Sequence, residues 1–219
     1  MANKTGLLII EFGIFTDTLT SKAATKMCPH APHNNGIQSD ATALLVRCVN
    51  LYGDNVKYFA YGSNMSLPRL KERVPSAERV GVFALAEHTL KFHKVNKKDG
   101  SGKCDAQFTG SPDDVVIGAL FEISDNEKVA LDKAEGLGYG YQDKTVQIRD
   151  EQGEMIEAVT YYATNIDPSL KPYSWYLFHV VYGAKETGVA ASYLSTIEST
   201  KSIEDPDRNR DARERAIYS

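Results

Sequence analysis

The stretch KYFAYGSNM, residues 57–65, joins the end of an apolar run to glycine, serine and asparagine. The apolar residues before Gly62 are typical of a buried β-strand. Gly62 permits backbone angles that other residues resist, and Ser66 followed by Pro68 is typical of the first turn of a helix. The stretch therefore predicts a strand, a tight turn and then a helix that reaches Arg73.

Such a turn can do chemistry or merely connect two elements. It leaves several backbone N–H groups pointing at one spot, and the start of the helix adds positive partial charge. An anion or a developing oxyanion fits there. Turns of this kind are also common as plain connections, so the turn alone leaves the function open.

Composition limits the class of protein. The 219 residues suit one domain with extensions or two small domains, and 42% hydrophobic and 25% charged residues are ordinary for a globular protein. A net charge of −4 gives no reason to expect nucleic acid or an acidic membrane as a partner. No apolar run is long enough to span a bilayer. The three widely spaced cysteines predict a reducing compartment, and hence the cytoplasm.

Residues 1–55 differ in character from the rest and are interpreted as an N-terminal extension of unknown role. Residues 28–40, CPHAPHNNGIQSD, have the composition of a loop. Cys28, His30 and His33 in this segment suggest a metal site at first sight. No closing pair with ligand spacing follows them, so a loop is favoured over a metal site.

From residue 56 onward the pattern predicts an α+β fold with a mixed or antiparallel sheet. Strands are predicted within residues 82–95 and 105–123, and a hairpin within residues 145–164 with its turn at residues 150–153. Helices are predicted at residues 172–188, with one apolar stripe, and at residues 190–197. Residues 201–219 form a charged tail, expected to be a solvated arm or a terminal helix.

A second informative stretch is SDNEKVALDKAEGLGYGY, residues 124–141. Ser124 and Glu127 match a capping box, and Gly136 stands where a helix commonly ends, so Glu135 falls in the last turn. The negative partial charge of a helix end disfavours a carboxylate and raises its pKa, which suits a general base. The alternative is an exposed glutamate paired with a nearby lysine, Lys133 or Lys128.

The GLGYGY segment after Glu135 adds a glycine-rich loop with two tyrosines. Tyr139 and Tyr141 can wall a small pocket or serve in ordinary packing. The three histidines downstream of the first strand, His88, His93 and His179, fall in no metal-ligand pattern and are interpreted as polar positions on strand or helix faces.

Together, YFAYGSNM and, about 70 residues later, LDKAEG resemble the γ-glutamylcyclotransferase family, whose fold is also called AIG2-like or BtrG-like. The segment WYLFHVVYGAKETGVAASYLSTIES resembles the C-terminal element of that family. The resemblance covers residues 56–199. It implies a mixed β-sheet or small barrel flanked by helices, in a domain at residues 56–200 between the extension and the charged tail.

The resemblance also implies a site. The loop that binds the γ-glutamyl group through backbone amides corresponds to Tyr61, Gly62, Ser63 and Asn64. The general acid/base corresponds to Glu135. A further pocket tyrosine corresponds to Tyr141, about one residue from the family spacing, with Tyr139 as the alternative.

The implied reaction converts a γ-glutamyl amino acid or γ-glutamyl amine into 5-oxoproline and the free amino acid or amine. It needs a small-molecule substrate, no metal and no cofactor. Glutathione and γ-glutamyl-tagged biosynthetic intermediates stay open as substrates, and a homodimer is one option for the assembly. A function of another class is a non-catalytic module on the same fold that binds a small molecule or a protein.

Deletion of residues 1 to about 50 is expected to leave cyclotransferase activity largely unchanged, because residues 24–40 are polar and irregular and little core should depend on them. The apolar run GLLIIEFGIF opposes this expectation. Glu11 interrupts it, so a short strand or an extension is favoured over a signal peptide. Turnover and thermal melting of a chain that begins near Asn55 measure the effect. Insolubility or a large fall in melting temperature would make the extension part of the domain.

Overall fold

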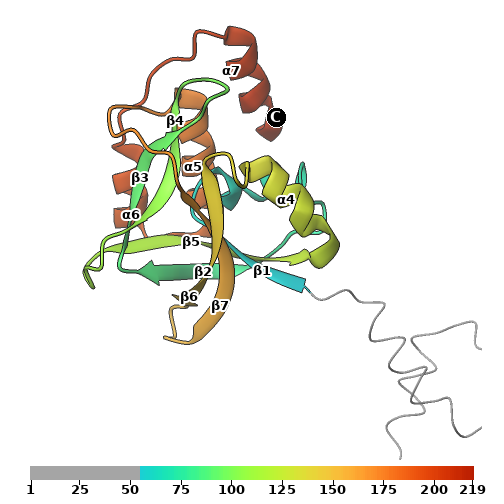
Figure 1. The fold of residues 1–219 in the computed structure, drawn as a ribbon, viewed down its shortest axis with the longest axis vertical. Coiled ribbons are helices and arrows are strands. Elements are labelled where there is room, and N and C mark those ends of the chain that lie inside the picture. The colour runs from blue at the N-terminus through green and yellow to red at the C-terminus, as the bar shows by residue number, and fades with distance from the viewer. Residues whose placement is uncertain (1–54) are drawn as a thin grey trace, which may run out of the picture. The chain divides into compact units, whose positions relative to one another are not determined.

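The computed structural model describes residues 55–219, and its centre is a closed five-stranded barrel (Figure 1). In order around the barrel, the strands are β1 (Asn55–Ala60), β5 (Val115–Ser124), β2 (Glu78–Ala86), β6 (Tyr141–Arg149) and β7 (Met155–Ala163). Strand β1 runs antiparallel to β5 and parallel to β7. The predicted α+β class with a small mixed barrel is confirmed, as is the hairpin of β6 and β7.

A separate two-stranded sheet consists of β3 (His88–Val95) and β4 (Gly102–Phe108), which pair antiparallel. Residues 82–95, predicted as strand material, therefore divide between β2 in the barrel and β3 outside it. The division falls at Glu87, whose φ of 60° lies in the left-handed region and turns the chain out of the barrel.

The helices and 3₁₀ turns lie between strands in the first part of the domain and follow the last strand, β7, in the second. They are η1 (Ser63–Met65), α3 (Leu67–Lys71), η2 (Asp125–Glu127), α4 (Lys128–Glu135), α5 (Ser174–Thr187), α6 (Ala191–Glu198), α7 (Arg208–Arg215) and η3 (Ala216–Tyr218). Helices α5 and α6 confirm the two helices predicted near the C-terminal end. In the described residues, no helix has the length and apolar character that a membrane span requires.

Two predicted helix starts have different outcomes. Ser66 caps α3 by accepting from the Arg69 N–H, as expected, although α3 ends at Lys71 rather than Arg73. The capping box is wrong: the Ser124 side chain caps nothing, and the Glu127 carboxylate accepts from the backbone and hydroxyl of Ser76 at 3.0 and 2.6 Å. The backbone N–H and the hydroxyl of Ser76, in a turn distant in the sequence, take the place of the single backbone N–H that a capping box would offer to the Glu127 carboxylate.

Helix α5 holds the η1 loop at close range. A Cβ on Gly183 of α5 would lie 2.4 Å from the backbone nitrogen of Ser66 and 2.7 Å from the carbonyl carbon of Met65. Only a glycine allows two backbone segments to approach this closely. The contact fixes the position of the loop that follows β1.

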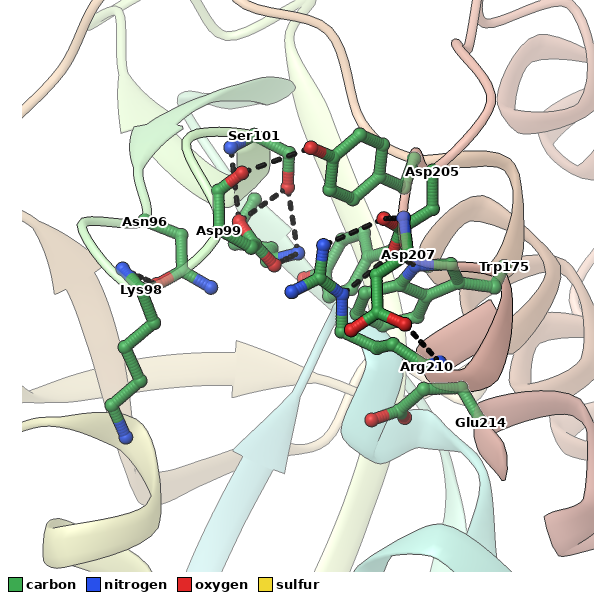
Figure 2. Close-up of polar contacts among 12 residues, drawn as sticks. Asn96, Lys98, Asp99, Ser101, Trp175, Asp205, Asp207, Arg210 and Glu214 are labelled. Atoms are coloured by element: carbon green, nitrogen blue, oxygen red, sulfur yellow. Dashed lines mark hydrogen bonds and ion pairs between the residues drawn. The ribbon is translucent and has the colours of Figure 1, made fainter. Parts of the chain in front are cut away.

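The charged C-terminal segment is docked and not a solvated arm. Asp205 is fully buried and accepts from the Trp175 indole at 2.7 Å and from the guanidinium of Arg210. Figure 2 shows Arg210 between Asp205 and the turn that carries Asp99. Of the two predicted alternatives, the terminal helix is the one that forms, and α7 packs against α5. The interpretations of the extension and of Cys28, His30 and His33 lie outside the described residues.

Candidate active site

One pocket lies where β1 ends, next to the last turn of α4, and it encloses about 300 Å³ of empty space including its mouth. Its lining consists of Tyr58, Tyr61, Gly62, Ser63, Asn64, Cys104, Glu135, Tyr141, Tyr161 and Tyr176. The structure thus brings together every residue that the sequence placed in the site.

Gly62 is required for a different reason from the one predicted. Its φ is −116°, so the left-handed region is not involved. A Cβ at this position would instead lie 3.0 Å from the Cβ and 3.3 Å from the Sγ of Cys104. The loop passes directly over β4, and a side chain on Gly62 would force the two segments apart.

The pocket-lining loop has backbone N–H groups that its own 3₁₀ turn does not use. In η1, the Met65 N–H donates to the Gly62 carbonyl at 3.0 Å and the Ser66 N–H to the Ser63 carbonyl at 3.4 Å. The first N–H groups of a helical turn have no acceptor within that turn. The N–H groups of Ser63 and Asn64 therefore have no partner within η1.

Glu135 is directed into the pocket by the end of α4. Gly136 adopts a left-handed conformation with φ 75°, and its N–H closes the helix on the Asp132 and Lys133 carbonyls, as predicted. Oε1 of Glu135 accepts from the Asn64 side-chain amide and from the Tyr58 hydroxyl, the latter at 3.4 Å.

The alternative of an exposed, lysine-paired glutamate is wrong. Lys128 pairs with Asp132 and Asp143 instead of Glu135. Asp132 also accepts from the Tyr161 hydroxyl at 2.5 Å, so the acidic group that faces the lysine and the one that faces the pocket are different residues. The Glu135 carboxylate faces the pocket.

The environment raises the pKa of Glu135, in the predicted direction. Burial is the main cause, because it disfavours the charged carboxylate. Nearby cations oppose burial and lower the pKa by less; they are Arg73, Lys94 and Arg69. Burial in the pocket, more than the position at the helix end, therefore produces the shift.

Tyrosines form most of the pocket wall and are anchored by their hydroxyls. Tyr61 donates to the Tyr161 carbonyl and Tyr141 to the Cys104 carbonyl, both at 2.5 Å. Burial raises the pKa of both hydroxyls well above that of an ordinary tyrosine, so they stay neutral donors. Tyr139 is 85% exposed, so of the two alternatives Tyr141 is the one that lines the pocket.

Four lining residues were not anticipated as site residues: Tyr58, Cys104, Tyr161 and Tyr176. Tyr176 falls on the apolar stripe of the predicted C-terminal helix, and no spacing in the sequence marks the other three as site residues. Burial raises the pKa of the Cys104 thiol to about 12, so it is a poor nucleophile at neutral pH.

Polar contacts within the fold account for the buried histidines. His93 pairs with Asp105 at 2.8 Å, and His179 contacts Glu214 and the Tyr218 hydroxyl. Within residues 55–219, no three side chains of the metal-binding types come together in a site that could hold an ion.

Comparison with known proteins gives consistent results. Residues 115–197 match the model of the AIG2-like family. Gamma-glutamylcyclotransferase from Bos taurus is 32% identical over 151 residues, which are 67% of this chain and 79% of the relative. The protein of the same name from Homo sapiens is 32% identical over 158 residues, 68% of this chain and 79% of the relative. A solved structure named gamma-glutamyl cyclotransferase has a TM-score of 0.68 and 26% identity, and covers 75% of this chain and 99% of its own.

Proposed function

The chain belongs to the γ-glutamylcyclotransferase family, and from this membership we propose that it converts a γ-glutamyl amino acid or γ-glutamyl amine into 5-oxoproline and the free amino acid or amine. One observation carries the proposal: Glu135, with a raised pKa, faces the loop of Gly62, Ser63 and Asn64 across a small tyrosine-lined pocket. The relatives are named as cyclotransferases, which favours an enzyme over a non-catalytic binding module.

The proposed reaction is an intramolecular acyl transfer. The α-amino nitrogen of the substrate attacks its own γ-carbonyl carbon, and a new C–N bond closes a five-membered lactam. The original amide C–N bond then breaks, and the amine leaves. Because the substrate carries the nucleophile, the protein needs none, and the high pKa of the Cys104 thiol agrees with that.

Glu135 is proposed to perform both proton transfers. The carboxylate takes a proton from the attacking nitrogen and later gives it to the departing nitrogen, so no proton is gained or lost over the cycle. A carboxyl with a raised pKa suits both roles, because it is a stronger base than an ordinary glutamate and still returns the proton.

The loop and the tyrosines supply the remaining functions in this proposal. The backbone N–H groups of Ser63 and Asn64 stabilise the negative charge that develops on the γ-carbonyl oxygen. The hydroxyls of Tyr61 and Tyr141 donate to backbone carbonyls, so the two rings form fixed walls of the pocket. Such walls hold the substrate curled, with amine and carbonyl in contact.

A substrate panel tests the proposal. The purified protein is incubated separately with γ-glutamyl amino acids, γ-glutamyl amines and glutathione, and 5-oxoproline is measured by mass spectrometry. Release from at least one member, absent in a reaction with the Glu135→Gln variant, supports the proposal. No 5-oxoproline from any member of the panel would reject it.

The pH dependence of kcat/KM is expected to show an acid limb above the range of an ordinary glutamate. The free enzyme must hold Glu135 as a carboxylate, so activity is full above the raised pKa and falls as the pH drops through it. Initial rates between pH 4 and 9 measure the profile. An acid limb at the pKa of an exposed glutamate would contradict the assignment.

A further inference from the structure

Arg73, just beyond α3, reaches toward the pocket without lining it. Its Nη1 donates to the Oδ1 of Asn64 and to the backbone carbonyl of Arg69, both at 3.2 Å. The second contact is itself anchored, because the Arg69 guanidinium pairs with Glu214 of α7 at 2.6 Å. Arg73 is therefore held at a defined distance from the Asn64 side chain.

The chemistry of a guanidinium decides which way the Asn64 amide faces. Arginine has only donors, so the atom of Asn64 that faces Arg73 must be the carbonyl oxygen. The NH₂ group then faces the other way, toward the Tyr58 hydroxyl at 3.2 Å and Oε1 of Glu135. A rotated amide would place its oxygen against the carboxylate and its NH₂ against the guanidinium, and both contacts would be repulsive.

We propose that Arg73 is a positioning residue, which holds the Asn64 amide in the one orientation that donates a hydrogen bond to Glu135. The inference rests on the proposed role of Glu135 as general acid/base. It assigns Asn64 a side-chain function in addition to the backbone amide that the loop supplies.

The consequence concerns the ionised state of Glu135. Burial raises the pKa of Glu135. A hydrogen bond donated to a carboxylate favours the charged form, so the Asn64 amide, oriented as a donor to Oε1, acts against that rise. Loss of Arg73 removes a nearby positive charge and also frees the amide to rotate. Both changes raise the pKa of Glu135 further.

Other groups around Glu135 set the background for this effect. Two further cations act on it, Arg69 from α3 and Lys94 from β3. The remaining titratable neighbours in the pocket are neutral at physiological pH: Tyr58 and Tyr61 at β1, Cys104 on β4, Tyr141 on β6, Tyr161 on β7 and Tyr176 on α5.

A double-mutant cycle separates two effects of Arg73 on the pKa of Glu135: the orientation of the Asn64 amide and the positive charge of the guanidinium. The variants are Arg73→Met, Asn64→Ala and the double variant, with Lys71→Met as a control that removes an exposed cation from α3. The titration of the Glu135 carboxyl is followed by ¹³C NMR and assigned by its absence in Glu135→Gln. Where the enzyme turns over, the acid limb of kcat/KM is measured as well.

Arg73→Met is expected to move the Glu135 titration to higher pH and to lower kcat/KM at neutral pH by about ten- to a hundredfold, the contribution of one hydrogen bond to a charged group. The same substitution in the Asn64→Ala background is expected to give a clearly smaller shift, because only the charge is then lost. Lys71→Met is expected to leave the titration unchanged.

An equal shift with and without Asn64 would show that Arg73 acts through its charge alone and would overturn the inference, as would the absence of any shift. Arg73→Leu, a shorter side chain with no hydrogen-bond donor, carries the same expectation if Arg73→Met does not fold. The NMR titration needs no turnover, so it tests Arg73 independently. Failure of the wild-type protein on the whole substrate panel would reject the proposed function instead.

Discussion

Substitution of Glu135 by glutamine is expected to lower turnover by about 10²- to 10⁴-fold, the usual cost of losing a general acid–base. Glutamine has nearly the same shape, and its carbonyl oxygen can still accept from Asn64, as Glu135 does. It cannot take the proton of the attacking nitrogen. Turnover is measured as 5-oxoproline formation by the purified variant and wild type at the same protein concentration.

The fold of this variant is expected to be at least as stable as that of the wild type at neutral pH. The pKa of Glu135 is raised in the folded state, so the native protein binds this proton more readily than the unfolded chain. Stability from this group therefore falls as pH rises from the unfolded pKa through the raised folded pKa. Glutamine carries no charge and removes that penalty, which thermal melting would detect.

Glu127→Gln is the matched control, because Glu127 lies just before the same helix but contacts Ser76 and does not line the pocket. It is expected to keep wild-type turnover even if it melts at a lower temperature. If Glu135→Gln kept more than about a third of wild-type activity, the loss would be far below that of a general acid–base and the role would belong to another residue.

Substitution of Gly62 by valine is expected to lower kcat/KM by about a hundredfold, the effect of moving reacting groups by roughly 1 Å. A Cβ at this position already meets the Cβ of Cys104 at 3.0 Å, and the two methyl groups of valine add to the conflict. The loop that carries Ser63 and Asn64 must then move away from β4. Kinetics on the best substrate of the panel, together with thermal melting, would measure both effects.

Alanine substitutions at two glycines provide the matched comparison. Gly62→Ala introduces the 3.0 Å contact, whereas Gly81→Ala on β2 introduces only an ordinary contact of 3.6 Å with Phe83. Gly62→Ala should lower kcat/KM, and Gly81→Ala should leave it unchanged. Cys104→Gly removes both atoms that the new Cβ would approach most closely, so adding it to Gly62→Ala should restore part of kcat/KM. Undiminished catalytic efficiency in Gly62→Val would mean that the loop is only a connection.

Local patterns in the sequence determined several elements correctly. Ser66 caps α3, Gly136 ends α4 and the β6–β7 hairpin turns after Arg149, because caps, left-handed glycines and hairpin turns depend on residues close together in the chain. The motif resemblance identified six residues, from Tyr61 to Tyr141, that line one pocket. It did so by likeness to a family, since no rule of spacing places a loop and a glutamate about 70 residues apart in contact.

Only the tertiary structure decided the rest, because the deciding contacts join distant segments. Glu127 binds Ser76 instead of capping its own helix, and Gly62 is glycine because β4 passes beneath it. The pocket wall takes Tyr161 from β7 and Tyr176 from α5, which meet β1 only when the barrel closes and α5 packs on η1. Burial of Glu135 and the orientation of Asn64 by Arg73 follow from that closure, since desolvation and hydrogen bonding depend on distances in space and not on separation along the chain.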